Sequence, residues 1–180
     1  MTLEQLAKQG RRTASMTTAA TITSKMTQIR KESIKQAFGD FDNVKYRYEY
    51  VDVVDGVTYY DDSAACSTEA SWFSFDNMNE PVVWITYADN RDCDDLIAQV
   101  KRYAKAIICI GNDTERFHKV YDSILKVMDC DTLEKAVKMA SLVAESGDSV
   151  MLSPATHVNA DYDSYMDRGD AFKQFVHSLK

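Results

Sequence analysis

Glycine is scarce in this chain, which has only 6 in 180 residues, about 3% against the roughly 7% of an average protein. No two glycines lie closer than 17 residues apart. The phosphate-binding patterns G-x-x-x-x-G-K-[ST] and G-x-G-x-x-G both need closely spaced glycines, because only glycine lets successive backbone N–H groups close around a phosphate. The sequence therefore excludes both kinds of phosphate loop.

Closely spaced metal or redox ligands are also missing. The chain has 4 cysteines and 3 histidines, but neither a C-x-x-C nor an H-E-x-x-H pattern. Cys109 lies in the apolar run AIICI, where a free thiol packs as a small hydrophobic side chain. We expect no metal site, and a reducing cytoplasm is the simplest compartment for such widely spaced cysteines.

Positive charge and long apolar runs are the next absences. The formal net charge is −7, which opposes electrostatic binding to nucleic acid or to an anionic membrane. Arg11 and Arg12 are not followed by an apolar stretch of secretory-signal length, and no run approaches the length of a membrane span. We therefore expect a cytoplasmic protein with neither nucleic acid nor membrane among its partners.

Hydrophobic periodicity divides the chain into two parts. Residues 1–40 carry an approximate helical stripe, and Gly39 stands where a helix end favours glycine. Residues 45–54 alternate in the manner of a β-strand, the dipeptide Asp55-Gly56 is typical of a hairpin turn, and residues 57–60 form the returning strand. We predict an N-terminal helical extension over 1–40 and a separate domain over 41–180.

The remaining elements alternate between buried strands and helices. Short apolar runs rich in β-branched residues predict strands at 82–87, 106–110 and 149–152, with a further strand at 124–128. Helical spacing predicts helices at 68–78, 92–104, 113–121, 132–144 and 162–179. This order predicts an α/β fold: a Rossmann-like, mostly parallel sheet flanked by helices, with a β-hairpin near its start. Ligands of such sheets gather at the carboxyl ends of the strands.

Several segments in these positions resemble a known family. They occur in order and with matching spacing over residues 17–180: IRKESIKQAF at 29–38, YRYEYV at 46–51, GVTYYDDS at 56–63, GDSVMLSP at 147–154 and DRGDAF at 167–172. The chain resembles the C-terminal domain of Mur ligases, and within them the D-glutamate-adding enzymes of peptidoglycan synthesis. The resemblance implies a Rossmann-like domain that closes over ATP and the incoming amino acid in a three-domain enzyme. By this resemblance we expect residues 1–40 to correspond to the last helices of the ATP-binding central domain, in agreement with the missing phosphate loop.

The sequence departs from the family at the positions that bind anions. The family's H-R-x-E segment is Y-R-Y-E at 46–49, which keeps Arg47, the arginine that approaches ATP in the family, and loses the histidine. Its D-S-K-A-T-N segment keeps Asp62 but has Ala64 in place of the phosphate-side lysine. Ala88 and Val158 replace the lysine and the hydroxyl that contact D-glutamate in the family. Most of what binding two anions requires has been lost.

The matching positions define a candidate site, a vestigial nucleotide and substrate cleft with no catalytic residue assigned. Its predicted residues are Arg47, Asp62, Ser63, Asp89, Ser153, His157 and Tyr165. Ser153 and His157 lack a suitably spaced nucleophile or base, so turn and packing roles compete with ligand binding. Helical spacing makes Tyr165 a core residue on one interpretation and a ligand contact on the other. Arg168 is predicted to form a structural ion pair.

Acidic residues have accumulated in the same loops. If the loops converge, their field would repel ATP and glutamate and favour a cation or a basic partner. Aspartates in turns and at helix starts also cap backbone N–H groups, which is the local explanation for most of them. The ten aspartates are Asp61, Asp62, Asp89, Asp92, Asp94, Asp95, Asp161, Asp163, Asp167 and Asp170.

Three functional hypotheses follow. In the first, the chain is a stand-alone, catalytically inactive Mur ligase-like domain that binds a Mur ligase or another basic-surfaced protein and needs no cofactor. In the second, it is one half of a split ligase, and ATP and magnesium enter with the other polypeptide. In the third, the old cleft has become a site for a small ligand or a metal.

Overall fold

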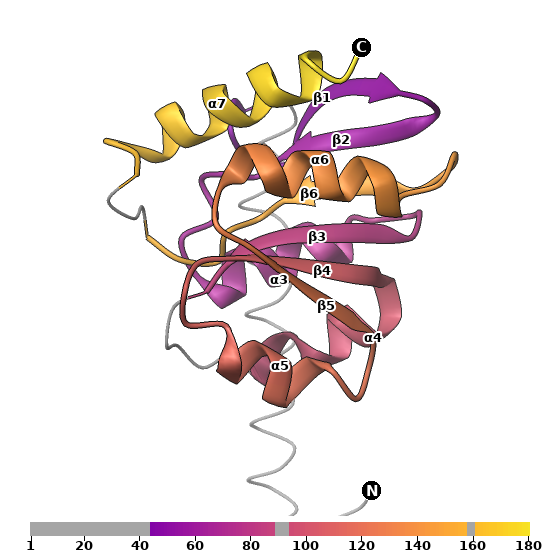
Figure 1. Ribbon diagram of the computed structural model, residues 1–180, viewed down its shortest axis with the longest axis vertical. Helices are drawn as coiled ribbons and strands as arrows, with labels where there is room; N and C mark the ends of the chain where they lie inside the picture. The colour runs from indigo at the N-terminus through magenta and orange to yellow at the C-terminus, as the bar shows by residue number, and fades with distance from the viewer. Residues whose placement is uncertain (1–43, 89–93, 158–160) are drawn as a thin grey trace, which may run out of the picture. The chain divides into compact units, whose positions relative to one another are not determined.

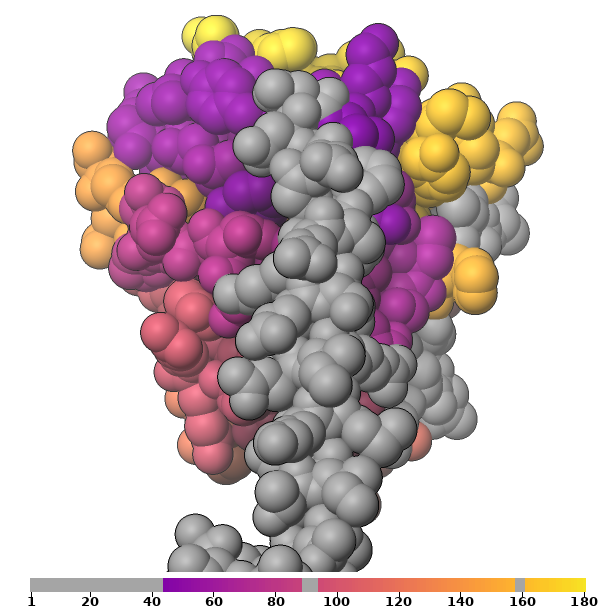
Figure 2. All heavy atoms as spheres, turned by 180° about the vertical axis from the view of Figure 1, so that it is seen from behind, coloured from indigo at the N-terminus to yellow at the C-terminus, as the bar shows by residue number. Residues whose placement is uncertain are grey.

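The computed structural model describes residues 44–88, 94–157 and 161–180, which are coloured in Figure 1 and, seen from behind, in Figure 2. These residues form six strands and five α-helices, with one short 3-10 helix. The strands are β1 (Glu49–Val54), β2 (Val57–Asp61), β3 (Val82–Tyr87), β4 (Ala104–Ile110), β5 (Lys126–Cys130) and β6 (Ser149–Leu152). The helices are α3 (Thr68–Asp76), η1 (Asp94–Leu96), α4 (Ile97–Tyr103), α5 (Glu115–Tyr121), α6 (Leu133–Val143) and α7 (Tyr165–His177).

A tight turn creates the hairpin that opens the domain. Asp55 and Gly56 both have positive φ, 51° and 79°, which gives the turn the twist that antiparallel strands need. Strands β1 and β2 pair antiparallel from Val54 opposite Val57, with a register shift between Tyr50 and Asp52. The predicted hairpin is confirmed, and its turn comes from residues that tolerate positive φ.

All six strands form one sheet in the order β1-β2-β6-β3-β4-β5, in which every pair except β1 and β2 is parallel. Strand β6, the last in sequence, lies between β2 and β3 and pairs parallel with both. After β3, the strands β4 and β5 are added on one side of it. Strand β6 is then added on the other side of β3, so the direction in which strands are added reverses there. The predicted α/β fold with a mostly parallel sheet is confirmed. The loops after β2, β3 and β6 lie at one edge, because these three neighbouring strands are parallel.

Helices cover both faces of the sheet (Figure 1). Helices α6 and α7 pack on one face against alternate residues of the central strands, among them Ile85, Ile108 and Leu152. Helices α3, α4 and α5 pack on the other face against the intervening residues, among them Trp84, Ile107 and Met151. Because both faces are covered, every residue of β3 and β6 is buried, which explains the unbroken apolar runs in the sequence.

Trp84 lies at the centre of the hydrophobic core on the face of the sheet that α3, α4 and α5 cover. Its ring contacts Phe75 of α3 and both Phe117 and Tyr121 of α5, with ring centroids 5.2, 6.2 and 6.3 Å away. The indole Nε1 donates a 2.8 Å hydrogen bond to the carbonyl oxygen of Ser153. One fully buried side chain therefore joins two helices to the backbone at the end of β6.

Several predicted boundaries differ from those observed, among them those of β1, of the η1–α4 segment and of β5. Strand β1 begins at Glu49 rather than at residue 45, because Tyr46 and Tyr48 adopt positive φ of 66° and 47°, which ends extended pairing. The described part of the helix predicted at 92–104 divides into η1 and α4, and the strand predicted at 124–128 is β5, two residues later. The predicted extension at 1–40 lies outside the described residues, so the division at residue 40 stays a prediction.

We expect Trp84→Phe to lower the free energy of unfolding by about 2 kcal/mol, because it removes buried ring volume and leaves the Ser153 carbonyl without its donor. Trp72→Phe is the matched control, since Trp72 is only half-buried, and its cost should be clearly smaller. Urea unfolding followed by far-ultraviolet circular dichroism measures both. Equal costs would contradict a central role for Trp84.

Candidate functional site

The candidate site lies where β2, β3 and β6 end. The backbone N–H of Asp62 donates to the carbonyl of Leu152 at 2.8 Å, and the N–H of Ser153 donates to the carbonyl of Ile85 at 3.0 Å. These bonds continue the parallel pairing one residue beyond the strands. They bring two of the predicted site residues, Asp62 and Ser153, side by side.

The Asp62 carboxylate is the centre of a buried polar network. Its Oδ2 accepts hydrogen bonds from Ser74 Oγ at 2.6 Å and from Ser153 Oγ at 2.7 Å, and its Oδ1 accepts one from the backbone N–H of Tyr48 at 3.2 Å. Ser153 Oγ also lies 2.6 Å from Ser71 Oγ. Asp62, Ser71 and Ser153 are fully buried, so the carboxylate joins β2, β6, α3 and the segment before β1.

Burial changes the protonation of this group. Loss of water around Asp62 raises its pKa from 3.8 to about 6, against the opposing effect of the Ser74 and Ser153 hydrogen bonds and of the Arg47 charge. A carboxylate that already accepts three protein hydrogen bonds and reaches no solvent has little capacity left for a ligand. Asp62 is therefore placed to hold the loops together.

The segment 46–48 is held in a conformation that large side chains rarely adopt. Tyr46 and Tyr48 have positive φ on either side of Arg47, which is uncommon for any residue other than glycine. Hydrogen bonds fix both tyrosines. The Tyr46 N–H donates to Glu49 Oε2 at 2.7 Å and its carbonyl accepts from the N–H of Ala64 at 2.9 Å, while the Tyr48 N–H donates to Asp62 Oδ1 at 3.2 Å. The segment presents Arg47 half-buried beside Asp62.

Helix α7 completes the site from the other side. Arg168 is fully buried, its Nη2 donates to the carbonyl of Ser63 at 2.8 Å, and its Nη1 lies 3.5 Å from the carbonyl of His157. Its guanidinium lies over the ring of Tyr87, 5.3 Å from the centroid. The structural role predicted for Arg168 is confirmed, but the predicted ion pair is wrong for the described residues: carbonyls and a ring replace the carboxylate.

The residue after Arg168 must be small. A Cβ on Gly169 would lie 2.4 Å from Ser63 Oγ and 2.6 Å from Asp61 Oδ2, closer than real contacts allow. One turn further on, Lys173 Nζ lies 2.7 Å from Glu49 Oε2 and 3.4 Å from Asp61 Oδ2. Helix α7 thus packs directly on the loop after β2, and its lysine offsets part of the charge of the buried Asp61.

The structure places six of the seven predicted site residues in two environments. Asp62, Ser63 and Ser153 are buried and Arg47 is half-buried, and these four lie together around the network. His157 and Tyr165 are exposed, so Tyr165 is not the core residue that helical spacing suggested. Tyr165 makes an edge contact with Tyr46 at 5.9 Å between ring centroids. Asp89 lies outside the described residues.

The predicted acidic edge needs one correction. Asp61 and Asp62 are fully buried, and burial raises the pKa of both carboxyls, so they contribute no exposed charge to a partner surface. Asp89 and Asp92 lie outside the described residues. The other six aspartates of the set are exposed: Asp94, Asp95, Asp161, Asp163, Asp167 and Asp170.

Sequence reasoning missed the serines of α3 and the lysine of α7. Ser71 and Ser74 are three residues apart, which places both hydroxyls on one face of a helix. Two buried hydroxyls opposite the end of β2 are a usable signal for a buried acceptor, but only once the packing partner of that face is known. Lys173 gave no signal, because a single lysine on a predicted helix usually faces solvent.

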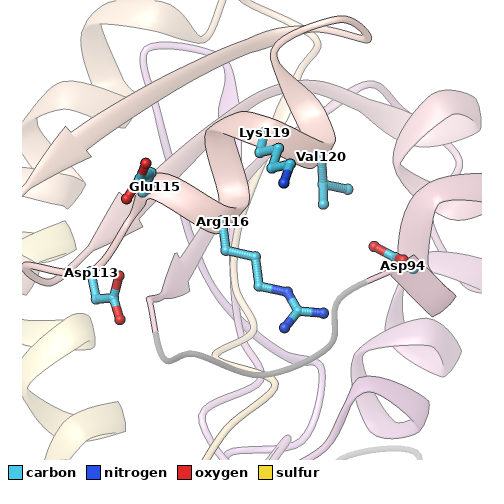
Figure 3. Close-up of a pocket in the computed structure, with 6 residues that line it drawn as sticks. All are labelled: Asp94, Asp113, Glu115, Arg116, Lys119 and Val120. Carbon is cyan, nitrogen blue, oxygen red and sulfur yellow. The ribbon is translucent and has the colours of Figure 1, made fainter.

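An open groove lies apart from this network (Figure 3). It has a volume of about 670 Å³ and runs between η1 and α5, with Arg116 and Lys119 reaching toward its centre and Asp94 on the opposite wall. Asp113, Glu115 and Val120 also line it. None of the described residues that line it belongs to the predicted cleft.

Metal ligands and membrane-spanning segments were sought among the described residues. Within them no group of three or more histidine, cysteine, aspartate or glutamate side chains is arranged to hold a metal ion. None of the described helices is long and apolar enough to cross a membrane.

The site therefore belongs to an α/β domain whose strand ends carry a closed polar network. No protein-family model matches the chain. Curated relatives do: it is 34% identical over 182 residues to the UDP-N-acetylmuramoylalanine–D-glutamate ligase of Christiangramia forsetii, covering 99% of this chain and 41% of that enzyme. It is 33% identical to the ligase of the same name from Porphyromonas gingivalis, covering 98% of this chain and 40% of that enzyme.

Solved structures share the fold. A domain of a UDP-N-acetylmuramate:L-alanyl-gamma-D-glutamyl-meso-diaminopimelate ligase from Haemophilus ducreyi matches 74% of this chain with its whole length, at a TM-score of 0.53 and 15% identity. A murein peptide ligase from Psychrobacter arcticus matches 77% of this chain with 30% of its own, at a TM-score of 0.53 and 13% identity.

These findings confirm the resemblance. The chain is a homologue of one part of the UDP-N-acetylmuramoylalanine–D-glutamate ligases, and its described domain has a Mur ligase-like α/β fold. It spans about two fifths of the length of the curated relatives it matches.

Asp62→Asn should remove a pH-dependent component of stability. Because the folded-state pKa is raised, the proton on Asp62 favours the folded state at low pH, and this contribution is lost as pH rises from about 4 through about 6. The unfolding free energy of the wild type minus that of D62N should fall by about 2 to 3 kcal/mol over this window. Asp163→Asn, at an exposed aspartate, is the control, and parallel curves for D62N and wild type would refute the assignment.

Arg168→Lys should destabilise the domain by about 2 to 4 kcal/mol, because an ammonium cannot reproduce the planar fork that reaches Ser63 and packs on Tyr87. Arg102 also lies over a tyrosine ring, 5.0 Å from the centroid of Tyr103, but it is exposed. Arg102→Lys should therefore change stability by less than about 0.5 kcal/mol. Urea denaturation of both variants makes the comparison, and equal effects would argue against a special role for the buried arginine.

Proposed function

We propose that this chain is a Mur ligase-like binding domain of the bacterial cytoplasm that does not itself catalyse ligation. The observation that carries the proposal is the closed network around Asp62. The groups retained at the strand ends satisfy one another: Asp62 accepts from two serines and a backbone N–H, and Arg168 donates to a backbone carbonyl. They maintain the scaffold of a ligase cleft and are occupied within the protein, while Ser63 Oγ and Arg168 Nε beside them make no hydrogen bond to the described residues.

The electrostatics of the same edge support this proposal. Binding a nucleotide and an acidic amino acid requires cations aimed at two anions. Ala64, whose position carries a lysine in the family, is half-buried in this loop, and Ala88 follows β3 directly. Two buried acids, Asp61 and Asp62, lie beneath the loop instead. An incoming phosphate would meet Arg47 as the retained family cation, because Lys173 already pairs with Glu49 and Asp61.

ATP with magnesium fits these residues poorly. In the described part of the chain, the carboxylates nearest the network are buried and already bonded, so they are not placed to coordinate a cation. We therefore propose that the chain alone uses no cofactor. Exposed aspartates of the α7 region and a net charge of −7 favour a partner with a basic surface, and a Mur ligase is the foremost candidate.

One observation favours a second function. Nearly the whole chain aligns with relatives that are named as ligases, and the alignment covers about 40% of their length. A complementary polypeptide could supply the rest, including a phosphate loop, magnesium ligands and ATP. The chain would then be one half of a split acid–amino-acid ligase of peptidoglycan precursor synthesis, with half-buried Arg47 as its retained nucleotide contact.

The first experiment tests for catalysis by the chain alone. Purified protein is incubated with ATP, magnesium, UDP-N-acetylmuramoyl-L-alanine and D-glutamate, and phosphate release is measured. We expect no release above the rate without protein, and no shift in melting temperature with ATP, because a ligand that binds only the folded state would raise that temperature. Phosphate release that depends on both D-glutamate and the chain would overturn the proposal.

Two further arms separate the alternatives. Adding a fragment of a relative that carries its other domains should restore phosphate release only if the chain works as half of a ligase. Ala64→Lys returns a cation to the loop after β2 and should raise ATP affinity if lost charge is the limiting factor. Ala98→Lys, at an exposed alanine on α4, is the matched control, because it adds the same charge away from the loop.

A further inference from the structure

A histidine outside the candidate site lies between two carboxylates. His118 of α5 has its Nδ1 2.9 Å from Asp122 Oδ1, four residues later, and its Nε2 3.0 Å from both carboxylate oxygens of Asp129 on β5. Thr114 Oγ1 donates to Asp129 Oδ2 at 3.0 Å, which fixes that carboxylate from the start of the helix. The imidazole therefore connects α5 to the edge strand of the sheet.

This geometry favours the protonated, positively charged form of the His118 ring. A neutral imidazole carries one N–H and can donate to only one of the two carboxylates, whereas an imidazolium donates to both. Among the described residues, the charged groups that act on the ring are Asp129 from β5 and Asp122 from α5. Glu115, Arg116 and Lys119 of α5 line the groove instead. With an acid on each side, the protonated ring is the form that satisfies every partner.

The same helix forms a wall of the groove described above. Helix α5 has only seven residues, and its buried side chains Phe117 and Tyr121 hold it on the sheet. A helix this short has little stability of its own, so its position depends on its contacts. The His118 contacts lie near its C-terminal end, where a positive charge also interacts favourably with the helix dipole.

We propose that His118 is a protonation-dependent clip: as an imidazolium it fastens α5 to β5 and fixes the wall of the groove, and its deprotonation releases that wall. The hydrogen bonds to Asp129 and Asp122 raise the pKa of the ring. A raised pKa means that the stabilising contribution is complete below the unfolded value near 6.5 and is lost as pH rises through the folded value. The clip is thus closed in acid and opens toward alkaline pH.

Hydrogen exchange and ring titration test this clip on the intact chain. Protection factors of the α5 amides are followed by NMR from about pH 6 to pH 9, with the α6 amides as internal reference. Since each exposed ion pair is worth a fraction of a kcal/mol, we expect α5 protection to fall about threefold to tenfold across the His118 titration while α6 stays constant. Constant α5 protection across that titration would overturn the proposal.

Variants assign the effect to the two carboxylates. His118→Asn identifies the His118 ring signals by their loss and should abolish the pH dependence of α5 protection. Asp129→Asn should lower the midpoint of the His118 titration, and Asp131→Asn, at a neighbouring acid paired with Lys135, should leave it unchanged. A midpoint that D129N does not move would refute the clip, and this readout needs only the folded protein.

Discussion

The burial of one carboxylate is the constraint on which the rest of this edge depends. Asp62 follows a buried strand and points between α3 and the end of β6, where no solvent reaches it. A buried charge without partners would cost several kcal/mol, so the surrounding chain must supply donors. It does so with Ser74, Ser153 and the N–H of Tyr48, and each donor fixes a different element in place.

That arrangement has a consequence for the shape of the site. The Tyr48 N–H donates to Asp62, and the Tyr46 carbonyl accepts from the N–H of Ala64. These hydrogen bonds hold both tyrosines at positive φ, a conformation that the local sequence disfavours. Helix α7 packs on the other side of the same loop, where Gly169 allows close approach and Arg168 reaches the Ser63 carbonyl. The result is a frame with a Mur ligase-like fold in which distant segments hold the loop after β2 from both sides.

Much of the fold and part of the site could be predicted from the sequence. The hairpin was predictable because Asp55-Gly56 suits positive φ, and the central strands because helices on both faces require unbroken apolar runs. Asp62 and Ser153 were found as neighbours because parallel strand ends meet at one edge. The helix predicted at 92–104 was treated as one element, because periodicity does not register the change from 3-10 to α geometry between η1 and α4.

The sequence by itself determined the element types, the mostly parallel sheet and the absence of a phosphate loop, because these depend on local periodicity and on residue types that only certain backbones accept. Only the tertiary structure decided the roles of the polar residues. Whether Asp62 offers its charge or buries it, whether Arg168 meets a carboxylate or a carbonyl, and whether His118 is free or bridging depend on which distant segments pack against them. Burial and hydrogen-bond geometry are set by that packing, and a single aspartate, arginine or histidine in a sequence carries no record of it.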